Sequence, residues 1–457
     1  MFAVFQKTNT PLHRNLRTNC SVLLDAEQNV PYNLSKLFYK AFLMAINYQH
    51  YSTKRRRRFI MKKFVAILLS VATCVLAIVS LTACEKASKE LSYVLTVDGE
   101  AYICTGVGMC EDIDIVIPDK HKGKPVVEIG DCAFQNNLYI RSLTFGDNIV
   151  AVGKDNLVGC DNIESVVIGN GLEDVSGFSF YNLEKLKNVT LGDNVAKIDK
   201  RAFYGSGVHF TEYEGMQYLG CSGNPYFALM SRLEETRREY TTFKINENCK
   251  LIGAWAFDSC YKLETLEIPD GVRSIGEYAF YGCSALKKVS VPDSITYIGR
   301  NFMDAYGNVN YEIFSEYCDG CYIGNEKNPY LALVLVKDDG GDDYRINDNC
   351  KLIGRSAFEN CKRLTSITIP DSVQSINDYA FYGDESLVSV TIGKGVAQIG
   401  SNLFEGCKLL RSLNYNGKMK DLNKISKNRD WKKGKEKLSD GNFKISTIKC
   451  SDGELYV

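Results

Sequence analysis

The chain has 457 residues, and its 55 Lys and Arg residues balance 55 Asp and Glu residues, which gives a formal net charge of zero at pH 7. Because neither sign of charge dominates, the composition does not indicate binding to nucleic acid or to an anionic surface. A chain of this length can hold two or three ordinary domains, but an internal repeat would override that estimate.

Residues 1–60 contain neither a repeat nor a clear hydrophobic period. An export signal follows them, whereas such a signal normally opens a protein. We therefore expect this segment to be a leader upstream of a natural start at Met61. The alternative is a short, poorly ordered extension on the cytoplasmic side.

Residues 61–83 are predicted to be an export signal. Lys62 and Lys63 provide its basic start, and the run 64–81 is almost entirely apolar. The alternative is an uncleaved transmembrane helix, since about 18 to 20 apolar residues span a bilayer. Both interpretations place the rest of the chain outside the cell.

A four-residue motif, Leu81-Thr82-Ala83-Cys84, ends this apolar run. It resembles the lipobox of bacterial lipoproteins, in which small residues precede an acylated Cys. The resemblance implies that Cys84 becomes the first residue and carries the lipid that anchors the protein, with more than one acyl chain for stable anchoring. Residues 84–90 would then form a polar tether.

The segment 91–128 is expected to cap the N-terminal end of a repeat array. Asp98 and Gly99 lie between two segments of alternating polarity, which is typical of a β-hairpin. A cap is needed because an open end of such an array would expose apolar surface and an unpaired strand edge.

A short phrase then recurs on a fixed period of 23 residues within three blocks. A fixed period between about 20 and 29 residues is typical of leucine-rich repeats, in which each repeat is one strand plus a return segment. Clear copies of the phrase Ile-Gly-x-x-Ala-Phe begin at Ile129, Ile252, Ile275 and Ile353, and weaker copies begin at Val152, Val175, Ile198, Ile298, Ile376 and Ile399.

Each repeat also contains a short segment of alternating polarity, such as the one from Leu263 to Pro269. Leu266 and Ile268 fall on one side of this segment, which predicts a strand with one buried face. Pro269 ends the strand, where a missing N–H is tolerated. The Ala-Phe pair supplies one small and one large core residue to the return part of the coil. Since one coil cannot bury such a face alone, the coils are expected to stack and to form a parallel sheet.

Over roughly residues 91–415 this pattern resembles the BspA-type, or Treponema-type, leucine-rich-repeat family of bacterial surface proteins. The resemblance implies a right-handed repeat solenoid over residues 129–415, with a parallel β-sheet on one face. It also implies adhesion to proteins of a host or of a neighbouring cell. We expect less regular packing where the Ala-Phe pair is replaced, at Asn156-Leu157, Ser179-Phe180, Phe302-Met303 and Leu403-Phe404.

Two inserts, near 206–247 and 306–348, separate the three blocks. They resemble each other, because both contain Asn-Pro-Tyr and both are followed by Asn-Cys-Lys-Leu-Ile-Gly. We expect longer coils or β-hairpins built into the same stack, with Gly340-Gly341 as one turn. The alternative is that the inserts form binding lips on the rim.

After the last repeat the chain becomes rich in lysine. Its final part contains a second Asp-Gly turn, at Asp452-Gly453. We therefore expect residues 416–457 to be the C-terminal cap, which covers the other end of the solenoid.

Cysteines occupy one phase of several coils, three residues after the phenylalanine position. Residues of one phase point the same way in successive coils, so we expect a ladder of small buried thiols. Disulfides need pairs that face each other, although export would favour disulfides. The cysteines of this phase are Cys160, Cys260, Cys283, Cys361 and Cys407.

A separate pair, Cys318 and Cys321, has the spacing found in redox and zinc sites. No second pair at metal-site spacing accompanies it. We expect a local disulfide or free thiols at this place, with zinc or redox chemistry as the alternative.

No constellation of residues in the sequence indicates catalysis. The exported part contains only two histidines, His121 and His209, which lie far apart along the repeats and suggest no Cys-His or Ser-His-Asp arrangement. Glycine-rich phosphate loops and a dinucleotide fingerprint are absent from the sequence as well. We therefore expect no catalytic residues, no metal site and no cofactor.

The outward positions of the predicted strands form the candidate binding face. Small hydroxyl side chains dominate these positions, which β-propensity and solubility alone would also explain. Ten strands at about 4.8 Å would present a surface of roughly 50 Å, and solenoids usually bind through such extended faces. The residues of this face are Ser142, Thr144, Ser165, Asn188, Thr190, Thr265, Glu267, Lys288, Ser290, Ser366, Thr368, Ser389 and Thr391.

The sequence therefore predicts a monomeric, lipid-anchored protein on the outer side of a bacterial membrane or at the cell surface. Its repeat face is expected to bind proteins or other macromolecules, and nucleic acid is not among the expected partners. The alternative is a structural spacer that holds another surface component away from the membrane and has no ligand of its own. An enzyme is the third possibility, and it would need a site around Cys318 and Cys321.

Overall fold

The computed structural model describes residues 87–175, 180–233, 240–302, 313–337, 344–427 and 447–456. The expected leader, the export signal, Cys84 and the Gly340-Gly341 turn lie outside the described residues. By its internal contacts the chain divides after Glu85, and every described residue belongs to the unit from Lys86 to Val457.

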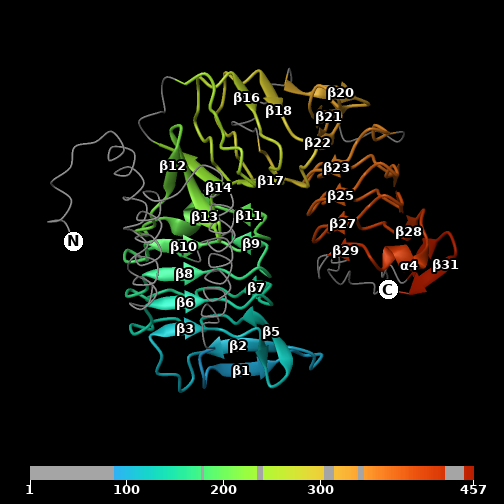
Figure 1. Cartoon of the computed structure of the whole chain (residues 1–457). Helices are drawn as coiled ribbons and strands as arrows, with labels where there is room; N and C mark the ends of the chain where they lie inside the picture. The colour runs from blue at the N-terminus through green and yellow to red at the C-terminus, as the bar shows by residue number, and fades with distance from the viewer. Residues whose placement is uncertain are drawn as a thin grey trace, which may run out of the picture. The chain divides into compact units, whose positions relative to one another are not determined.

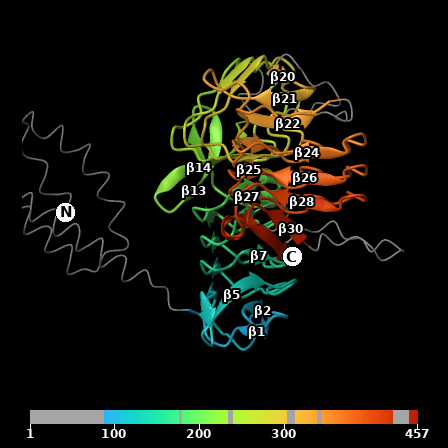
Figure 2. The same ribbon diagram turned by 90° about the vertical axis from the view of Figure 1, so that its right-hand side faces the viewer.

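Stacked coils form this unit, and each complete coil contributes one strand to a set of parallel strands that we name the strand ladder. These strands follow one another in chain order along the stack, as β3, β6, β8 and β10 do in Figure 1 and β24, β26 and β28 do in Figure 2. Strands of adjacent coils pair in register, as Leu143 does with Val166 and Ile367 with Val390. The strand ladder comprises β3 (Asp114–Val116), β6 (Ser142–Thr144), β8 (Ser165–Val167), β10 (Asn188–Thr190), β16 (Thr265–Glu267), β18 (Lys288–Ser290), β24 (Ser366–Thr368), β26 (Ser389–Ile392), β28 (Ser412–Tyr415) and β30 (Thr447–Cys450).

A second set of parallel strands, which we name the short ladder, runs along another side of the coils. Each of its strands has only two residues, and all of them except β29 contain the first residue of the Ile-Gly phrase or of one of its weaker copies. The sequence predicted only one strand per repeat, so this second set was not expected. Ile252 pairs with Ile275, and Ile275 with Ile298. The short ladder comprises β7 (Ala151–Val152), β9 (Asp174–Val175), β11 (Lys197–Ile198), β15 (Leu251–Ile252), β17 (Ser274–Ile275), β19 (Tyr297–Ile298), β23 (Leu352–Ile353), β25 (Ser375–Ile376), β27 (Gln398–Ile399) and β29 (Ser426–Lys427).

The core lies between the two ladders and the return segment, and the Ala-Phe pair fills it as predicted. Ala279 and Phe280 are 0% and 1% exposed. The phenylalanines of adjacent coils stack, so that the ring centroids of Phe257 and Phe280 lie 5.2 Å apart. We name this row of rings the ring column. Its members are Phe134, Phe180, Phe203, Phe257, Phe280, Phe358, Phe381 and Phe404.

Packing differs among the coils in which the Ala-Phe pair is replaced. Phe404 stacks on Phe381 at 5.7 Å and 21°, and Leu403 is fully buried. The expectation of less regular packing is therefore wrong at this coil, because leucine fits where alanine usually lies. Phe302 instead meets Phe280 edge-on, at 6.2 Å and 76°, because it comes one residue before the phase of the ring column. Ser179 and Met303 lie outside the described residues.

Each insert is an antiparallel meander whose last strand pairs in parallel with the next strand of the short ladder, as Leu229 does with Ile252 and Leu333 with Ile353. The prediction of hairpins built into the stack is confirmed. The Asn-Pro-Tyr motif acts alike in both inserts, since Asn224 and Asn328 each donate a side-chain hydrogen bond of 2.8 Å to a backbone carbonyl just before the next block. The strands are β12 (Thr211–Tyr213), β13 (Met216–Cys221) and β14 (Asn224–Arg232) in the first insert, and β20 (Ser315–Tyr317), β21 (Gly320–Ile323) and β22 (Ala332–Val336) in the second.

Both ends of the described unit carry antiparallel hairpins. At the N-terminal end β1 pairs with β2 around Asp98-Gly99, and at the C-terminal end β30 pairs with β31 around Asp452-Gly453, so both hairpins predicted from Asp-Gly are present. The remaining elements are β1 (Ser92–Leu95), β2 (Tyr102–Gly106), β4 (Lys120–His121), β5 (Lys124–Ile129), η2 (Lys200–Phe203), α4 (Met419–Leu422) and β31 (Gly453–Tyr456).

Phe280 tests the stacking of the coils, because it is packed between Phe257 and Phe302. Phe280→Ala is expected to lower the free energy of unfolding by about 3 to 5 kcal/mol, the usual cost of emptying a buried aromatic site. In a stacked array the loss should be felt mainly by the adjacent coils. Hydrogen exchange measures this, and protection that falls evenly along the whole unit, or nowhere, would contradict the stacking of independent coils.

Candidate binding surfaces and the junction between blocks

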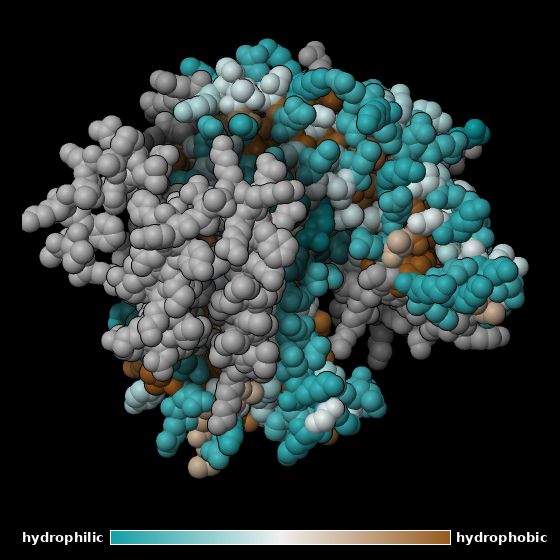
Figure 3. Space-filling model, viewed as in Figure 1, coloured by the Kyte–Doolittle hydropathy of each residue, from teal (hydrophilic) through white to brown (hydrophobic). Residues whose placement is uncertain are grey.

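All residues of the predicted binding face lie in the strand ladder, in β6, β8, β10, β16, β18, β24 and β26. Each of them is at least partly exposed, while the residue between each pair is buried, as Leu266 is between Thr265 and Glu267. The described surface is mostly hydrophilic in the view of Figure 3. The alternation in the sequence therefore gave the outward direction of these side chains correctly.

These residues nevertheless do not form one continuous face. The strand ladder consists of a four-stranded sheet (β10-β8-β6-β3), a two-stranded sheet (β16-β18) and a five-stranded sheet (β24-β26-β28-β30-β31). The inserts cause the division, because Leu191 after β10 donates its N–H to Gly220 in β13, and Val291 after β18 donates to Gly324 after β21. The expectation of a single face of ten strands is wrong, and we name the three surfaces face 1, face 2 and face 3 in chain order.

Face 1 brings together Ser142, Thr144, Ser165, Asn188 and Thr190 on three paired strands. Asp114 of β3 extends it, and its carboxylate accepts a 2.7 Å hydrogen bond from the Ser142 hydroxyl. The sequence gave no signal for this addition, because Asp114 and Ser142 are partners at a spacing that departs from the period of the repeat.

Face 2 is the smallest surface, with Thr265 and Glu267 on β16 next to Lys288 and Ser290 on β18. It differs from the other two faces because it carries charges of both signs. Lys288 Nζ lies 3.8 Å from Glu326 Oε1, and both side chains are largely exposed. Such an exposed ion pair contributes little to stability.

Face 3 contains Ser366, Thr368, Ser389 and Thr391, and β28, the middle strand of its sheet, adds Asn414. The Asn414 amide donates to the Thr391 hydroxyl at 3.4 Å. Ser412, which also lies on β28, is the in-register partner of Ser389. Asn414 and Ser412 were not predicted from the sequence to belong to the binding face. They lie 23 residues after Thr391 and Ser389, so the period of the repeat would have identified them.

A cluster of charged side chains, which we name the junction cluster, joins the three blocks at the short ladder. It consists of Lys197 from the first block, Glu277 and Tyr297 from the second, and Arg355 and Asp378 from the third. Lys197 forms an ion pair with Asp378 and lies 4.7 Å from the ring centroid of Tyr297. Arg355 Nη1 lies 2.7 Å from Glu277 Oε1 and 3.8 Å from Asp378 Oδ2.

Burial makes the carboxylate of Asp378 the centre of this cluster, since its side chain is only 6% exposed. Burial alone would raise the pKa of Asp378, but the adjacent Lys197 lowers it below its usual value. Burial would likewise lower the pKa of Lys197, yet Tyr297 and Asp378 raise it. The pair is therefore ionised at neutral pH, and its two members stabilise each other in a site that water barely reaches.

Backbone groups reinforce the same junction. Ala254 donates its N–H to Ile198 O at 2.9 Å, and Arg355 donates to Ile298 O at 3.0 Å, so each block begins against the last short-ladder strand of the block before it. The buried side chain of Asn377 accepts a 3.0 Å hydrogen bond from the N–H of Ile298. No sequence signal indicated these contacts, because the inserts and many repeats separate the partners along the chain.

The cysteine phase of the repeat is a ladder of free thiols, of which Cys160, Cys260 and Cys361 are buried as predicted, whereas Cys283 and Cys407 are partly exposed. Cys160, Cys283 and Cys407 each donate to the carbonyl of the phenylalanine one coil earlier, at distances of 3.0 to 3.2 Å. Asp384 occupies this phase between Cys361 and Cys407, and it accepts a 2.8 Å hydrogen bond from the N–H of Cys361. Burial raises the pKa of Asp384 to about 8, so that its carboxyl group is mostly protonated at neutral pH.

Of the second cysteine pair, Cys318 lies in the turn between β20 and β21, and Cys321 lies in β21. Both thiols are free, with Cys318 exposed and Cys321 buried. Burial raises the pKa of Cys321 to about 11, which leaves it a protonated thiol and a poor nucleophile at neutral pH. The two histidines lie elsewhere: His121 stacks on Tyr93 near the N-terminal end of the unit, with 4.0 Å between the ring centroids, and the backbone N–H of His209 donates to Lys187 O at 3.0 Å.

Within the six described stretches, no group of three or more His, Cys, Asp or Glu side chains is placed to bind a metal ion. No helix among these residues has the length and apolar character to cross a membrane.

Comparison with known proteins gives a match to one family. A family model described as "BspA type Leucine rich repeat region" matches six copies, over residues 110–218, 235–319 and 342–428. No curated protein matches the chain.

Several solved structures match with low identity and low TM-scores. A leucine rich cell surface protein from Faecalibacterium prausnitzii is 20% identical over 77% of this chain and 98% of its own, with a TM-score of 0.21. A leucine-rich repeat protein from Bacteroides ovatus is 18% identical over 80% of this chain and 99% of its own, with a TM-score of 0.26. The pneumococcal vaccine antigen PcpA is 16% identical over 73% of this chain and 88% of its own, with a TM-score of 0.21.

Asp378→Ala tests the junction cluster, because it leaves the cations of Lys197 and Arg355 without the carboxylate that they share. Removal of one partner of a buried ion pair typically costs about 3 to 5 kcal/mol, so we expect exchange protection to fall at β11, β19 and β25. The lowered pKa of Asp378 means that its stabilisation is present above about pH 4 and is lost as the pH falls further.

Asp371→Ala is the control for this change, since the pair of Asp371 with Lys394 is exposed and such pairs contribute about 1 kcal/mol or less. Equal effects of the two variants, or a loss at Asp378 confined to the third block, would refute a role of the cluster in joining the blocks.

Proposed function

The chain belongs to the BspA-type leucine-rich-repeat family, and from this membership we propose that it is a cell-surface protein that binds proteins of a host or of a neighbouring cell. The observation that supports binding most directly is the regular row of outward Ser and Thr side chains on faces 1 and 3. Small, uncharged hydroxyl groups need little desolvation energy and can donate and accept hydrogen bonds. They suit contact with a protein surface of either charge.

Face 3 is the best candidate for the contact. Its sheet has five strands, β24, β26, β28 and β30 of the strand ladder and the antiparallel β31, so it is the longest uninterrupted surface of the three. Thr368 and Thr391 are in-register partners on β24 and β26, the first two strands of this sheet. A typical specific interface buries about 800 Å² on each partner, which calls for a surface of several adjacent strands rather than one coil.

We propose in addition that the protein is held at the outer side of the membrane by a lipid on Cys84. The support is the Leu81-Thr82-Ala83-Cys84 motif behind a basic start and an apolar run, all of which lie outside the described residues. Two or more acyl chains would be needed for stable attachment, because one chain binds a membrane only reversibly.

Mass spectrometry of the protein from its native membrane tests the anchor. We expect a chain that begins at an acylated Cys84, and we expect Cys84→Ser to release the protein from the membrane fraction. An unacylated chain that still contains residues 61–83 would refute the anchor and would favour the transmembrane alternative.

The binding proposal is tested with the double change Thr368→Lys and Thr391→Lys. Two lysines one strand spacing apart repel each other and disturb an uncharged surface, while the buried Ile367 and Val390 beneath them stay in place. Partners would be captured from host-cell and neighbouring-cell surface proteins, and their affinity measured by biolayer interferometry. We expect a saturable interaction that the double change weakens at least tenfold, equivalent to about 1.4 kcal/mol.

Two matched variants locate the effect. Gln374→Lys with Ala397→Lys places the same charges on exposed residues of the same two coils, away from face 3; Ser142→Lys with Ser165→Lys places them on face 1. We expect thermal unfolding to be nearly unchanged in all three. If face 3 and face 1 variants both keep full affinity, the contact lies on face 2 or in the inserts. If no saturable partner is found, the spacer function replaces the proposal.

A further inference from the structure

The ring column is interrupted at one place in the first block. Phe180 and Phe203 stack in adjacent coils with their centroids 5.2 Å apart, and Phe134 lies two coils before Phe180. The coil between Phe134 and Phe180 has Leu157 at this position. Because leucine is smaller and less flat than phenylalanine, it cannot fill the space between two rings in the same way.

The short ladder also divides at this coil. The strand β7 pairs with β5 and belongs to the N-terminal sheet, whereas β9 pairs with β11 in a sheet of two strands. The strand ladder is continuous over the same two coils, since β6 and β8 pair in register along their whole length. The two coils are thus held together along the strand ladder and separated along the short ladder.

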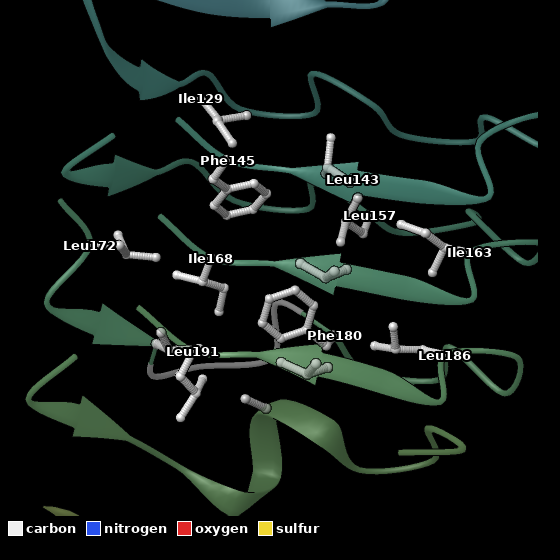
Figure 4. Close-up of a cluster of buried hydrophobic side chains, with 14 of the residues drawn as sticks. Ile129, Leu143, Phe145, Leu157, Ile163, Ile168, Leu172, Phe180, Leu186 and Leu191 are labelled. Atoms are coloured by element: carbon white, nitrogen blue, oxygen red, sulfur yellow. The ribbon is translucent and has the colours of Figure 1, made fainter. Parts of the chain in front are cut away.

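A cavity of about 300 Å³ opens between these two coils. Its wall is mostly apolar and comes from both ladders and the ring column. Figure 4 shows Leu157 and Phe180 among the side chains that point into the interior between the coils. The side chains that define the space best are Ile129, Leu143, Phe145, Leu157, Leu172 and Phe180.

Among the described wall residues, Asn156 has the polar side chain that lies in the interior, and its hydrogen bonds are made within the protein. Asn156 is 4% exposed, and its amide donates to Gly153 O at 2.7 Å while its carbonyl accepts from the N–H of Ala133 at 3.1 Å. Among the described residues of the wall, Asp174 is the one that carries a charge, and its side chain is exposed at the edge. A ligand that enters fully therefore meets mainly the carbon surface of the described side chains, together with the backbone of β7 and β9, which do not pair with each other.

We propose that this cavity is a binding site for an uncharged apolar molecule of the size of one or two fused rings. Apolar cavities of about 150 Å³ stay free of water and bind benzene, so a volume twice as large has room for a bicyclic ring. A charged molecule is excluded, because burial of its charge without a partner would cost several kcal/mol. The site is independent of the hydroxyl-lined faces, since its residues point inward.

The test uses indole as the probe and Leu157→Phe as the variant. A phenylalanine here would complete the ring column and fill the cavity, so we expect Leu157→Phe to raise Tm without ligand. Indole at millimolar concentration is expected to raise Tm of the unchanged protein, as any ligand of the native state does. In the variant, indole should bind at least about tenfold more weakly. Indole-3-acetate, which has the same rings and a negative charge, should give no shift.

Two further variants keep the test valid if the Leu157→Phe protein does not fold. Ala151→Leu fills the cavity from β7, where the residue is only half-buried, and is expected to abolish the response to indole. Phe203→Leu places the same leucine elsewhere in the ring column, outside the cavity wall, and is expected to lower Tm but to keep the response. Crystals under xenon pressure should show xenon beside Leu157.

The proposal is overturned if indole gives no shift with the unchanged protein, because the coils would then close over the space. It is also overturned if indole shifts Tm equally in the unchanged protein and in both filled variants, because indole would then bind elsewhere. The proposal is likewise overturned if xenon binds only at sites away from Leu157.

Discussion

Each coil of this protein has an apolar surface on the side facing the coil before it and on the side facing the coil after it. Only the neighbouring coils can cover these two surfaces. The ring column makes this dependence concrete, because a phenylalanine such as Phe280 is buried by the residues of the coils before and after it rather than by its own coil. The two parallel ladders follow from the same need, since coils that stack with their rings in contact bring their backbones to hydrogen-bonding distance. Stability in such an array comes from neighbours.

The inserts modify this array without ending it. Each continues the stack through β14 or β22, which pairs with the next short-ladder strand, while β13 and β21 close the strand ladder of the preceding block. The short ladder therefore becomes the place where blocks meet, and the junction cluster sits there. Asp378 is the buried member of this cluster, and without Lys197 and Arg355 its carboxylate would be an unpaired buried charge. The same inserts divide the outward hydroxyl surface into three faces, which limits how large a partner each face can contact.

Irregular coils have different consequences in different places. Leu403, beside Phe404, is fully buried in the core, and the rings of Phe381 and Phe404 still stack. Leucine in place of a ring at position 157 coincides with a divided short ladder and a cavity. The difference is physical: a larger residue at the small position of the pair adds contacts, whereas a smaller residue in the ring column removes them. Departures from a repeat are therefore the places to look for sites that the repeat itself does not explain.

The sequence by itself determined the repeat, the stacked coils, the buried Ala-Phe pair, the free thiol ladder, the terminal hairpins and the outward direction of residues such as Thr368. All of these depend on a period of 23 residues or on two-residue alternation, which are properties of neighbouring positions. The tertiary structure alone decided the short ladder, the division into three faces, the cavity beside Leu157 and the contact of Lys197 with Asp378. These depend on how complete coils and inserts are placed against one another, and no local pattern records a contact between residues that lie 181 positions apart.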